Sequence, residues 1–312
     1  MRSLAVCLAL LWLTACAPTF AIRGADSVSP AISNDYFLTR DGMKLPLRHW
    51  DAEGESPRVV LVALHGMSDY SNSFDMPARI WAKLGITTLA YDQRGFGRSE
   101  NPGLWSGADT MRADLNDAIA AARMRYPGVP VFVLGESMGG AVVLTALASS
   151  QPPAVDGAIL SAPAVWSRGD MPLSYRAALF LAAHVVPGMI LSNNAAGRVV
   201  KIVPSDNVPM LIALGKDPLF QKKTRIDTLF GLVNLMDEAR TAPERLKNPP
   251  PILLLHGEND QIIPPAPTKA VIAALGERAT VKTYPKGYHM LMRDLEGETV
   301  DRDIADWIFR NK

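Results

Sequence analysis

Residues 131–144 read Val131-Phe132-Val133-Leu134-Gly135-Glu136-Ser137-Met138-Gly139-Gly140-Ala141-Val142-Val143-Leu144. The first four residues form an apolar run typical of a buried strand, and the run from residue 141 is typical of a helix. Glycines on both sides of Ser137 permit the sharp strand-to-helix turn that exposes a serine hydroxyl at a helix N-terminus. A bare G-x-S-x-G motif arises by chance, but in this setting it indicates a nucleophilic serine. Ser137 is therefore the candidate nucleophile.

The alternation of strand and helix extends in both directions from this turn. Residues 59–64 are uninterruptedly apolar, which predicts a strand buried on both faces of a parallel sheet. Residues 35–50 read as two short strands joined at Asp41-Gly42, a dipeptide that favours a hairpin turn. Further strands are expected at 86–91, 129–134, 155–161, 252–255 and 280–284, and helices at 74–84, 108–126, 138–149, 266–275 and 293–310. This pattern predicts an α/β fold with a mostly parallel central sheet and helices on both faces.

The alternation is interrupted in the interval 164–243, where no buried strand is expected. Residues 171–191 are strongly apolar and helical or loop-like, and Arg176, His184 and Pro187 exclude a membrane-spanning helix. An insertion here would cover the C-terminal edge of the sheet, where such sheets place their sites. We therefore predict a core of residues 34–163 and 244–312 and a helical cap, or lid, at 164–243. Its apolar side chains either contact lipid or pack the cap against the core.

A serine hydroxyl needs a base to accept its proton and a third group to orient that base. Of the five histidines, His289 alone lies in a loop between the last predicted strand and the last predicted helix. That loop is where a base is expected in this type of fold. His65 and His256 each end an apolar run before a glycine, where a structural hydrogen bond is expected. His49 lies in the early hairpin and His184 in the cap.

The acid of such a triad should follow the preceding strand, where Glu258 and Asp260 both occur. Asp260 is the preferred acid because Glu258 falls at the turn directly after the strand, and Glu258 remains the alternative. The order serine, aspartate, histidine is the order expected of α/β-hydrolases. Two backbone N–H groups should receive the oxyanion, one from Met138 and one from Met67, beside Gly66.

The chain resembles the monoacylglycerol lipase and lysophospholipase branch of the α/β-hydrolases, the S33-type serine aminopeptidase-like hydrolases (Hydrolase_4), over about residues 35–310. The resemblance implies the α/β-hydrolase fold and a serine esterase activity. Glu136 is a departure, because these lipases usually carry histidine there. The stretch 92–99 reads as a structural loop fixed by Asp92 and Arg94. The motifs that carry the resemblance are His65-Gly66, Asp92-Gln93-Arg94-Gly95-Phe96-Gly97-Arg98-Ser99, residues 135–140, Ser161-Ala162-Pro163, Lys216-Asp217-Pro218-Leu219, residues 256–264 and Gly287-Tyr288-His289.

The N-terminus reads as an export signal. A positive start at Arg2 is followed by an apolar run over residues 4–13 that is too short to span a bilayer. The run ends in Leu13-Thr14-Ala15-Cys16, which resembles a bacterial lipobox. We therefore predict a lipoprotein signal peptide at 1–15, lipidation at Cys16, a tether at 16–33, and a bacterial cell envelope protein anchored to a membrane. The alternative is a secretory signal cut further on, for example after Ala21, which gives a secreted or periplasmic protein.

The composition argues against a nucleic-acid partner and against structural roles for cysteine. A formal net charge of +1 over 312 residues, without a basic cluster, argues against nucleic acid. The two cysteines, Cys7 and Cys16, both lie at the N-terminus, so the mature chain has no internal disulfide and no thiolate metal site. The proposed triad requires no metal and no organic cofactor.

The expected function is hydrolysis, through an acyl-enzyme, of a single-chain lipid ester such as a monoacylglycerol or a lysophospholipid. The expected partners are that lipid and a membrane surface. The anchor would contact this surface, and so would the cap if its apolar side chains face lipid. A non-lipid carboxylesterase and an S33-type aminopeptidase are the alternatives. An aminopeptidase needs cap carboxylates that hold an amine, whereas Asp170, Asp206 and Asp217 are scattered. A catalytically inactive envelope lipoprotein is a third alternative, but it predicts decay of the triad positions, which are all present.

Overall fold

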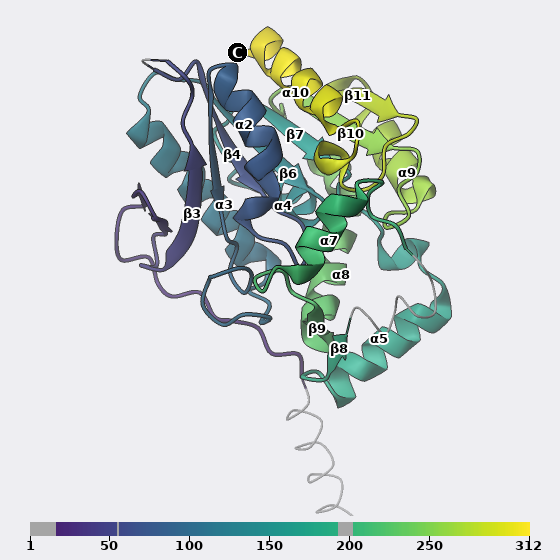
Figure 1. The fold of residues 1–312 in the computed structure, drawn as a ribbon. Helices are drawn as coiled ribbons and strands as arrows, with labels where there is room; N and C mark the ends of the chain where they lie inside the picture. Colours follow the sequence, from purple (N-terminus) through teal and green to yellow (C-terminus); the bar gives the residue numbers. More distant parts are fainter. Residues whose placement is uncertain (1–16, 55, 193–201) are drawn as a thin grey trace, which may run out of the picture.

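The computed structural model describes residues 17–54, 56–192 and 202–312. A nine-stranded sheet lies in the centre of the molecule in the order β1-β2-β3-β5-β4-β6-β7-β10-β11, and helices cover both of its faces (Figure 1). The strands of this sheet are β1 (Ala31–Ile32), β2 (Tyr36–Leu38), β3 (Lys44–Trp50), β4 (Val59–Leu64), β5 (Ile86–Tyr91), β6 (Val131–Glu136), β7 (Gly157–Ser161), β10 (Ile252–Gly257) and β11 (Ala279–Tyr284).

The sheet is parallel from β5 to β11, and the first three strands join it in antiparallel fashion. This arrangement is the α/β-hydrolase fold, and it confirms the predicted fold class. The predicted hairpin is formed by β2 and β3, with Gly42 between them at a φ of +82°. Strand β6 begins at Val131 rather than at the predicted residue 129, because Pro130 has no N–H to contribute to a sheet.

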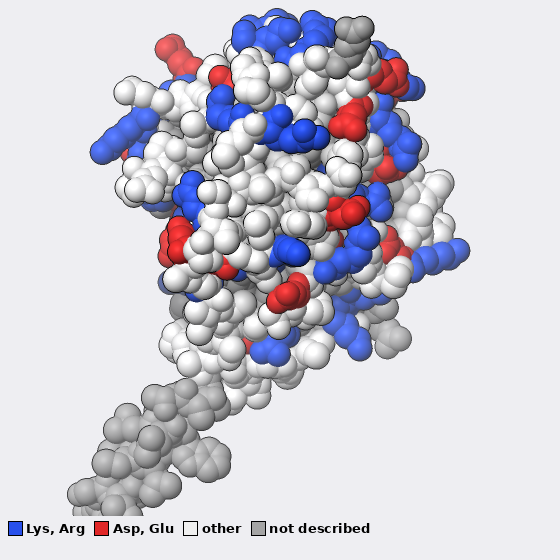
Figure 2. Space-filling view, turned by 90° about the vertical axis from the view of Figure 1, so that its left-hand side faces the viewer, with Lys and Arg blue, Asp and Glu red and all other residues white. Residues whose placement is uncertain are grey.

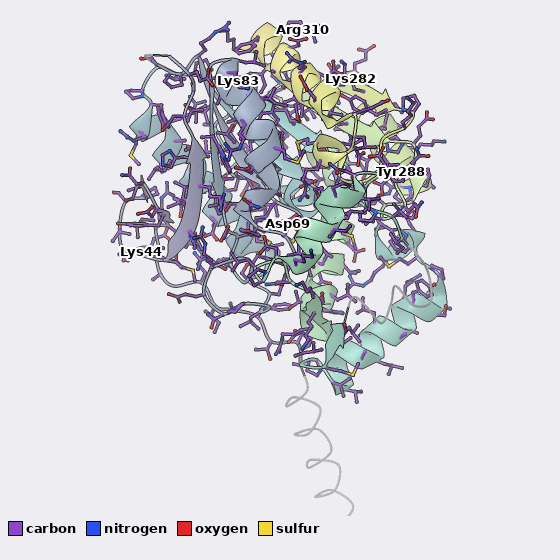
Figure 3. All side chains as sticks on the ribbon, viewed as in Figure 1. Lys44, Asp69, Lys83, Lys282, Tyr288 and Arg310 are labelled. Atoms are coloured by element: carbon purple, nitrogen blue, oxygen red, sulfur yellow. The ribbon has the colours of Figure 1, made fainter. Side chains whose placement is uncertain are left out.

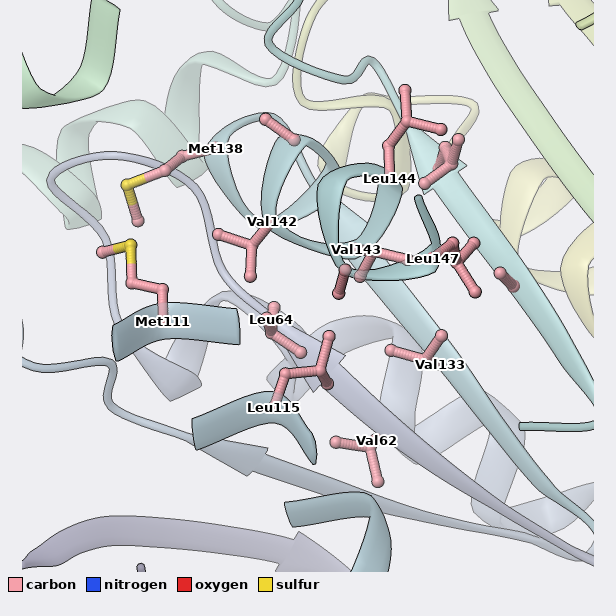
Figure 4. Close-up of a cluster of buried hydrophobic side chains, with 14 of the residues drawn as sticks. Val62, Leu64, Met111, Leu115, Val133, Met138, Val142, Val143, Leu144 and Leu147 are labelled. Carbon is pink, nitrogen blue, oxygen red and sulfur yellow. The ribbon is translucent and has the colours of Figure 1, made fainter. Parts of the chain in front are cut away.

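Alternate residues of the central strands point into two separate cores. In β4, Val60, Val62 and Leu64 join one buried cluster, whereas Val59, Leu61 and Ala63 join the other. The first cluster packs against α3 (Ala108–Arg125), α4 (Met138–Leu147) and α9 (Pro265–Leu275), and Figure 4 shows its centre. The second packs against α2 (Asp75–Lys83) and α10 (Gly297–Asn311). Burial on both faces explains why β4 is apolar throughout.

The insertion between β7 and β10 contains several short elements. They are α5 (Leu173–Val185), β8 (Ile190–Ser192), α7 (Val208–Lys216), β9 (Lys223–Arg225) and α8 (Ile226–Thr241). Strands β8 and β9 form a small antiparallel sheet of their own. Helix α8 falls within the predicted cap interval, yet Val233, Leu235 and Ala239 belong to the larger core cluster. Helix α5 is different, because its large apolar side chains are mostly exposed.

The segment predicted as a tether is held against the core over much of its length. The N–H of Ala21 donates to the carbonyl oxygen of Trp105 at 2.7 Å, and the N–H of Gly24 donates to Asp41 at 3.0 Å. The predicted signal peptide and Cys16 lie outside the described residues. Within residues 17–54, 56–192 and 202–312, no helix is both long and apolar enough to cross a membrane.

Candidate active site

Ser137 occupies the turn between β6 and α4 with φ 54° and ψ −113°, a conformation that non-glycine residues rarely adopt. The neighbouring positions must be glycine because a larger side chain would clash with the backbone around it. A Cβ atom on Gly135 would lie 2.3 Å from the carbonyl oxygen of Gly139, and one on Gly139 would lie 2.2 Å from that of Leu64. The turn therefore packs tightly enough to hold the serine in its strained conformation, as a nucleophile elbow requires.

Asp260 and His289 form the second part of the site. Oδ2 of Asp260, in the loop after β10, lies 2.8 Å from Nδ1 of His289, in the loop after β11. Their side chains are only 3% and 5% exposed. With a proton on Nδ1 donated to the carboxylate, the tautomer inferred from this contact, Nε2 of His289 is left free to accept another proton.

The surroundings of Asp260 keep it ionised. Burial by itself would raise the pKa of Asp260, but the hydrogen bond from His289 and those from the N–H groups of Ile262 and Ile263 hold that pKa below its usual range. Glu258, the alternative acid, lies exposed on the surface. The structure therefore brings Asp260, and not Glu258, to the imidazole.

Ser137 follows the central strand β6, whereas His289 follows β11, the last strand of the parallel set. In the described part of the chain, no hydrogen bond joins Ser137 Oγ to His289. Such bonds are often long in the absence of substrate. The two loops are nevertheless joined, because Arg293, four residues after His289, pairs with Glu136 directly before Ser137. The base loop and the nucleophile elbow therefore meet at the carboxyl edge of the sheet.

The candidate oxyanion loop lies beside the nucleophile. A Cβ atom on Gly66 would be 3.2 Å from Cβ of Ser137 and 3.8 Å from its Oγ, so the backbone at Gly66-Met67 lies against the serine. Met138 is the first residue of α4, where a backbone N–H has no partner within the helix. The structure thus places Gly66, directly before Met67, against Ser137, and Met138 directly after Ser137 at the start of α4.

His65 supports this loop rather than the reaction. Its Nδ1 lies 2.8 Å from the carbonyl oxygen of Gly66, and its Nε2 accepts from the N–H of Gln93 at 3.0 Å. Complete burial lowers the pKa of His65, so the ring stays neutral and both nitrogens are used. The expectation of a structural hydrogen bond at His65 is confirmed.

The loop at 92–99 is also structural, as predicted. Asp92 accepts from the N–H of Ser71 at 2.9 Å and from the N–H of Arg98 at 2.8 Å. These bonds tie the two ends of the loop to each other and to the segment at Ser71. Arg94 points away from the site and binds Asp41 and Asp114.

The segment just before α7, in the middle of the insertion, holds the base loop in place, which the sequence did not reveal. The N–H of Met290 donates to the carbonyl oxygen of Pro204 at 3.0 Å, and the N–H of Leu295 donates to Asp206 at 2.8 Å. Further along, Asp217 accepts from the Tyr70 hydroxyl at 2.7 Å, which connects α7 to the oxyanion side. The motif around Asp217 therefore anchors the insertion to the core.

Arg293 is a second residue that sequence reasoning missed. Glu136 stood out as a departure from the resembling lipases, but its partner lies 157 positions away. No local pattern connects two residues at that separation. Within the described ranges, no group of three or more His, Cys, Asp or Glu residues could hold a metal ion.

Comparison with known proteins shows similarity to one hydrolase family and to several lipases. Residues 55–296 match a family model described as serine aminopeptidase, S33. The chain is 27% identical over 277 residues to the monoglyceride lipase of Homo sapiens, covering 88% of this chain and 89% of that protein. It is 26% identical over 286 residues to a monoacylglycerol lipase of Mycolicibacterium smegmatis, and the match covers 90% of this chain and 98% of that protein. The crystal structure of the Paleococcus ferrophilus monoacylglycerol lipase superposes with a TM-score of 0.70 at 23% identity, covering 86% of this chain and all of that one.

Proposed function

Since the chain belongs to the serine aminopeptidase S33 family, we propose that it is a serine ester hydrolase whose substrates are single-chain lipid esters, namely monoacylglycerols or lysophospholipids. The observation that carries the proposal is the buried 2.8 Å contact between Asp260 and His289, in a loop that Arg293 ties to the elbow of Ser137. Acyl transfer needs this combination of an oriented base and an exposed nucleophile.

The reaction follows from the geometry. Ser137 Oγ attacks the ester carbonyl carbon while Nε2 of His289 accepts its proton, and Asp260 stabilises the imidazolium that forms. The N–H groups of Met67 and Met138 donate to the oxyanion. His289 then protonates the departing alcohol, leaving an acyl-enzyme. A water molecule, deprotonated by His289, attacks this ester and releases the fatty acid and free Ser137.

Two features support a lipid rather than a peptide substrate. The curated relatives named above are lipases of glycerides. The scattered carboxylates of the insertion are all engaged in internal contacts, which leaves them poorly suited to binding a substrate amine. Asp170 accepts from Ser167 and pairs with Arg240, Asp206 accepts from Leu295, and Asp217 accepts from Tyr70.

The same proposal includes a membrane-bound location in a bacterial cell envelope, with lipidation at Cys16 as the anchor. Helix α5 and the residues after it expose large apolar side chains, among them Leu173, Phe180, Leu181, Val185 and Ile190. A patch of this kind is typical of a surface that contacts lipid or protein. Figure 1 shows that the described chain begins at the same end of the molecule as α5. An anchor at that end would hold the apolar surface toward the bilayer.

Charged side chains also lie near this apolar surface. On the face shown in Figure 2, Lys and Arg side chains are densest at the top and others lie lower down, and Figure 3 labels Lys83 and Arg310 at the top. Arg176 on α5 and Lys223 in β9, which pairs with β8, are exposed as well. The proposed lipid contact would therefore include both apolar and cationic side chains.

A fluorophosphonate probe tests the proposed chemistry. We expect the purified protein to be labelled, Ser137→Ala to abolish labelling, and Ser106→Ala, which changes another buried serine, to leave it intact. Absence of labelling in the unaltered protein would contradict the proposal.

A substrate panel tests the proposed specificity. Monoacylglycerols, lysophospholipids, short soluble esters and aminoacyl amides are assayed side by side with the same preparation. The proposal requires the lipid esters to have the highest kcat/KM. A preference for aminoacyl amides would point to the aminopeptidase alternative, and a preference for short esters to a non-lipid carboxylesterase.

A further inference from the structure

Two strained turns meet at the site. Ser137 has φ 54°, and Ser68, in the turn after Gly66-Met67, has φ 70°. Both values lie in the left-handed region that favours glycine, and serine remains there only where the surrounding structure holds it. The turn at Ser68 is closed by the N–H of Asp69, which donates to the carbonyl oxygen of Gly66 at 3.3 Å. One turn carries the nucleophile and the other carries the Met67 N–H.

Arg293 binds the residue next to each strained serine. Its Nη1 donates to Asp69, which follows Ser68, at 2.8 Å. Its Nη2 donates to Glu136, which precedes Ser137, at 3.2 and 3.3 Å. The side chains of Arg293, Asp69 and Glu136 are only 6%, 4% and 3% exposed. Water therefore screens these contacts little. Figure 3 shows Asp69 toward the centre of the molecule, away from the labelled surface lysines.

The guanidinium also belongs to the loop of the base. Arg293 lies four residues after His289, and its carbonyl oxygen accepts from the side-chain amide of Asn207 at 2.9 Å. One side chain is therefore bonded to the oxyanion turn and to the nucleophile elbow while its backbone is fixed at the base loop. The rigid, planar guanidinium offers separate donors to the two carboxylates at fixed directions, which the flexible single ammonium of a lysine does not.

We propose that Arg293, acting through Asp69 and Glu136, is a positioning residue that holds the Met67 N–H and the Ser137 hydroxyl at the spacing that the tetrahedral intermediate requires. This inference rests on the proposed acyl-transfer function. Arg293 itself does not touch the reacting atoms. Its contribution should therefore appear in the transition state and not in substrate binding.

The test uses Asp69→Asn and Glu136→Gln, which keep the size of each side chain and remove one charge from each contact. With a short soluble ester, we expect kcat to fall about tenfold while KM changes less than about twofold. The affinity for a trifluoromethyl ketone, which forms a tetrahedral adduct with serine, should fall in parallel with kcat/KM. Rates are divided by the concentration of sites that react with a fluorophosphonate, so that unfolded protein does not contribute.

A matched control exists elsewhere in the chain. Arg94 likewise binds two buried carboxylates, Asp41 and Asp114, but away from the nucleophile. We expect Asp41→Asn to lower the melting temperature while leaving kcat and the ketone affinity unchanged. A third variant, Arg293→Lys, keeps the positive charge but loses the forked donors, and it should lose activity as the carboxylate variants do.

The outcomes separate the inference from the proposed function. If Ser137→Ala abolishes activity but Asp69→Asn, Glu136→Gln and Arg293→Lys all keep kcat per site and ketone affinity within about twofold of the unaltered protein, the positioning proposal is overturned. If Ser137→Ala retains activity, the proposed function itself fails. Should one variant not fold, the remaining two decide the question.

Discussion

Asp260 and Glu258 lie two positions apart on one turn, yet only Asp260 reaches the imidazole. The difference is one of direction: the Asp260 carboxylate turns inward, where it binds His289 and two backbone N–H groups. Glu258 follows Gly257, the last residue of β10, and turns into solvent. The sequence offered both carboxylates, and the local fold selects between them.

This selection leads to a paired prediction. Asp260→Asn should lower kcat/KM by about 10⁴-fold, because the amide no longer holds the imidazole in the tautomer that accepts the serine proton. Glu258→Gln should leave kcat/KM within about twofold of the unaltered protein, because its side chain contacts solvent. Steady-state kinetics with a soluble ester measure both. The reverse order of effects would make Glu258 the acid of the triad.

Helix α10 carries a buried carboxyl group that the reaction does not use. Asp301 is 1% exposed, and in the described part of the chain its Oδ1 has no hydrogen-bond partner. Burial, with a smaller contribution from Glu298, raises the pKa of Asp301 to about 9. The folded protein therefore retains a proton at neutral pH that the unfolded chain releases near pH 4. The free energy of unfolding should consequently fall as the pH rises from about 4, the pKa of the unfolded group, to about 9, the pKa of the folded one.

Removing the charge should reverse this loss. We expect Asp301→Asn to increase the free energy of unfolding by about 2 kcal/mol at pH 8. It should have little effect at pH 4, where the folded state is protonated and the unfolded state is still about half protonated. Urea denaturation at the two pH values gives the measurement. Glu298→Gln, on the same helix but exposed and paired with Arg302, serves as the control and should change stability by less than about 1 kcal/mol. Equal gains at both pH values would show that charge is not the cause.

At the scale of the whole molecule, the apolar surface of α5 lies at the same end as the start of the described chain (Figure 1). Because Ala21 is bonded to Trp105, an anchor at Cys16 could stand at most about 17 Å from that point in a fully extended chain. Such a short connection would restrict the orientations that the folded domain can adopt relative to a membrane. The end with α5 would then face the bilayer (Figure 1).

Variants on α5 test this orientation. Leu181 and Val185 are both 61% exposed, and Met124 on α3 is 58% exposed but lies on a core helix. Burying one such side chain in lipid is worth about 1.5 kcal/mol, so Leu181→Gln with Val185→Gln should lower activity on vesicle-bound monoacylglycerol by about tenfold or more. Activity on a short soluble ester should not change, and Met124→Gln should affect neither substrate.

Cys16→Ser gives an independent measurement of the anchor. Without lipidation, activity on vesicle-bound substrate should fall while the rate with the soluble ester is retained. Equal loss on both substrates, in either the cap or the anchor variants, would count against a role in membrane attachment.

Much of the architecture was readable from the sequence. The continuous apolar run at 59–64 predicted β4 within its observed bounds, because a strand buried on both faces of a parallel sheet is rich in apolar residues. The bounds predicted for β5 were also observed. The glycines around Ser137 predicted the elbow, because no other residue fits that turn. These features depend on neighbours within a few positions along the chain, and composition and spacing report such neighbours directly.

The tertiary structure decided what depends on residues far apart in the chain. The pairing of Glu136 with Arg293, the docking of the segment after Ala21 and the exposure of α5 all belong to this class. Each follows from how separate elements pack, and identical local sequences could pack differently. Local sequence thus determined which elements form and which chemistry they carry, whereas long-range packing determined which of those side chains meet.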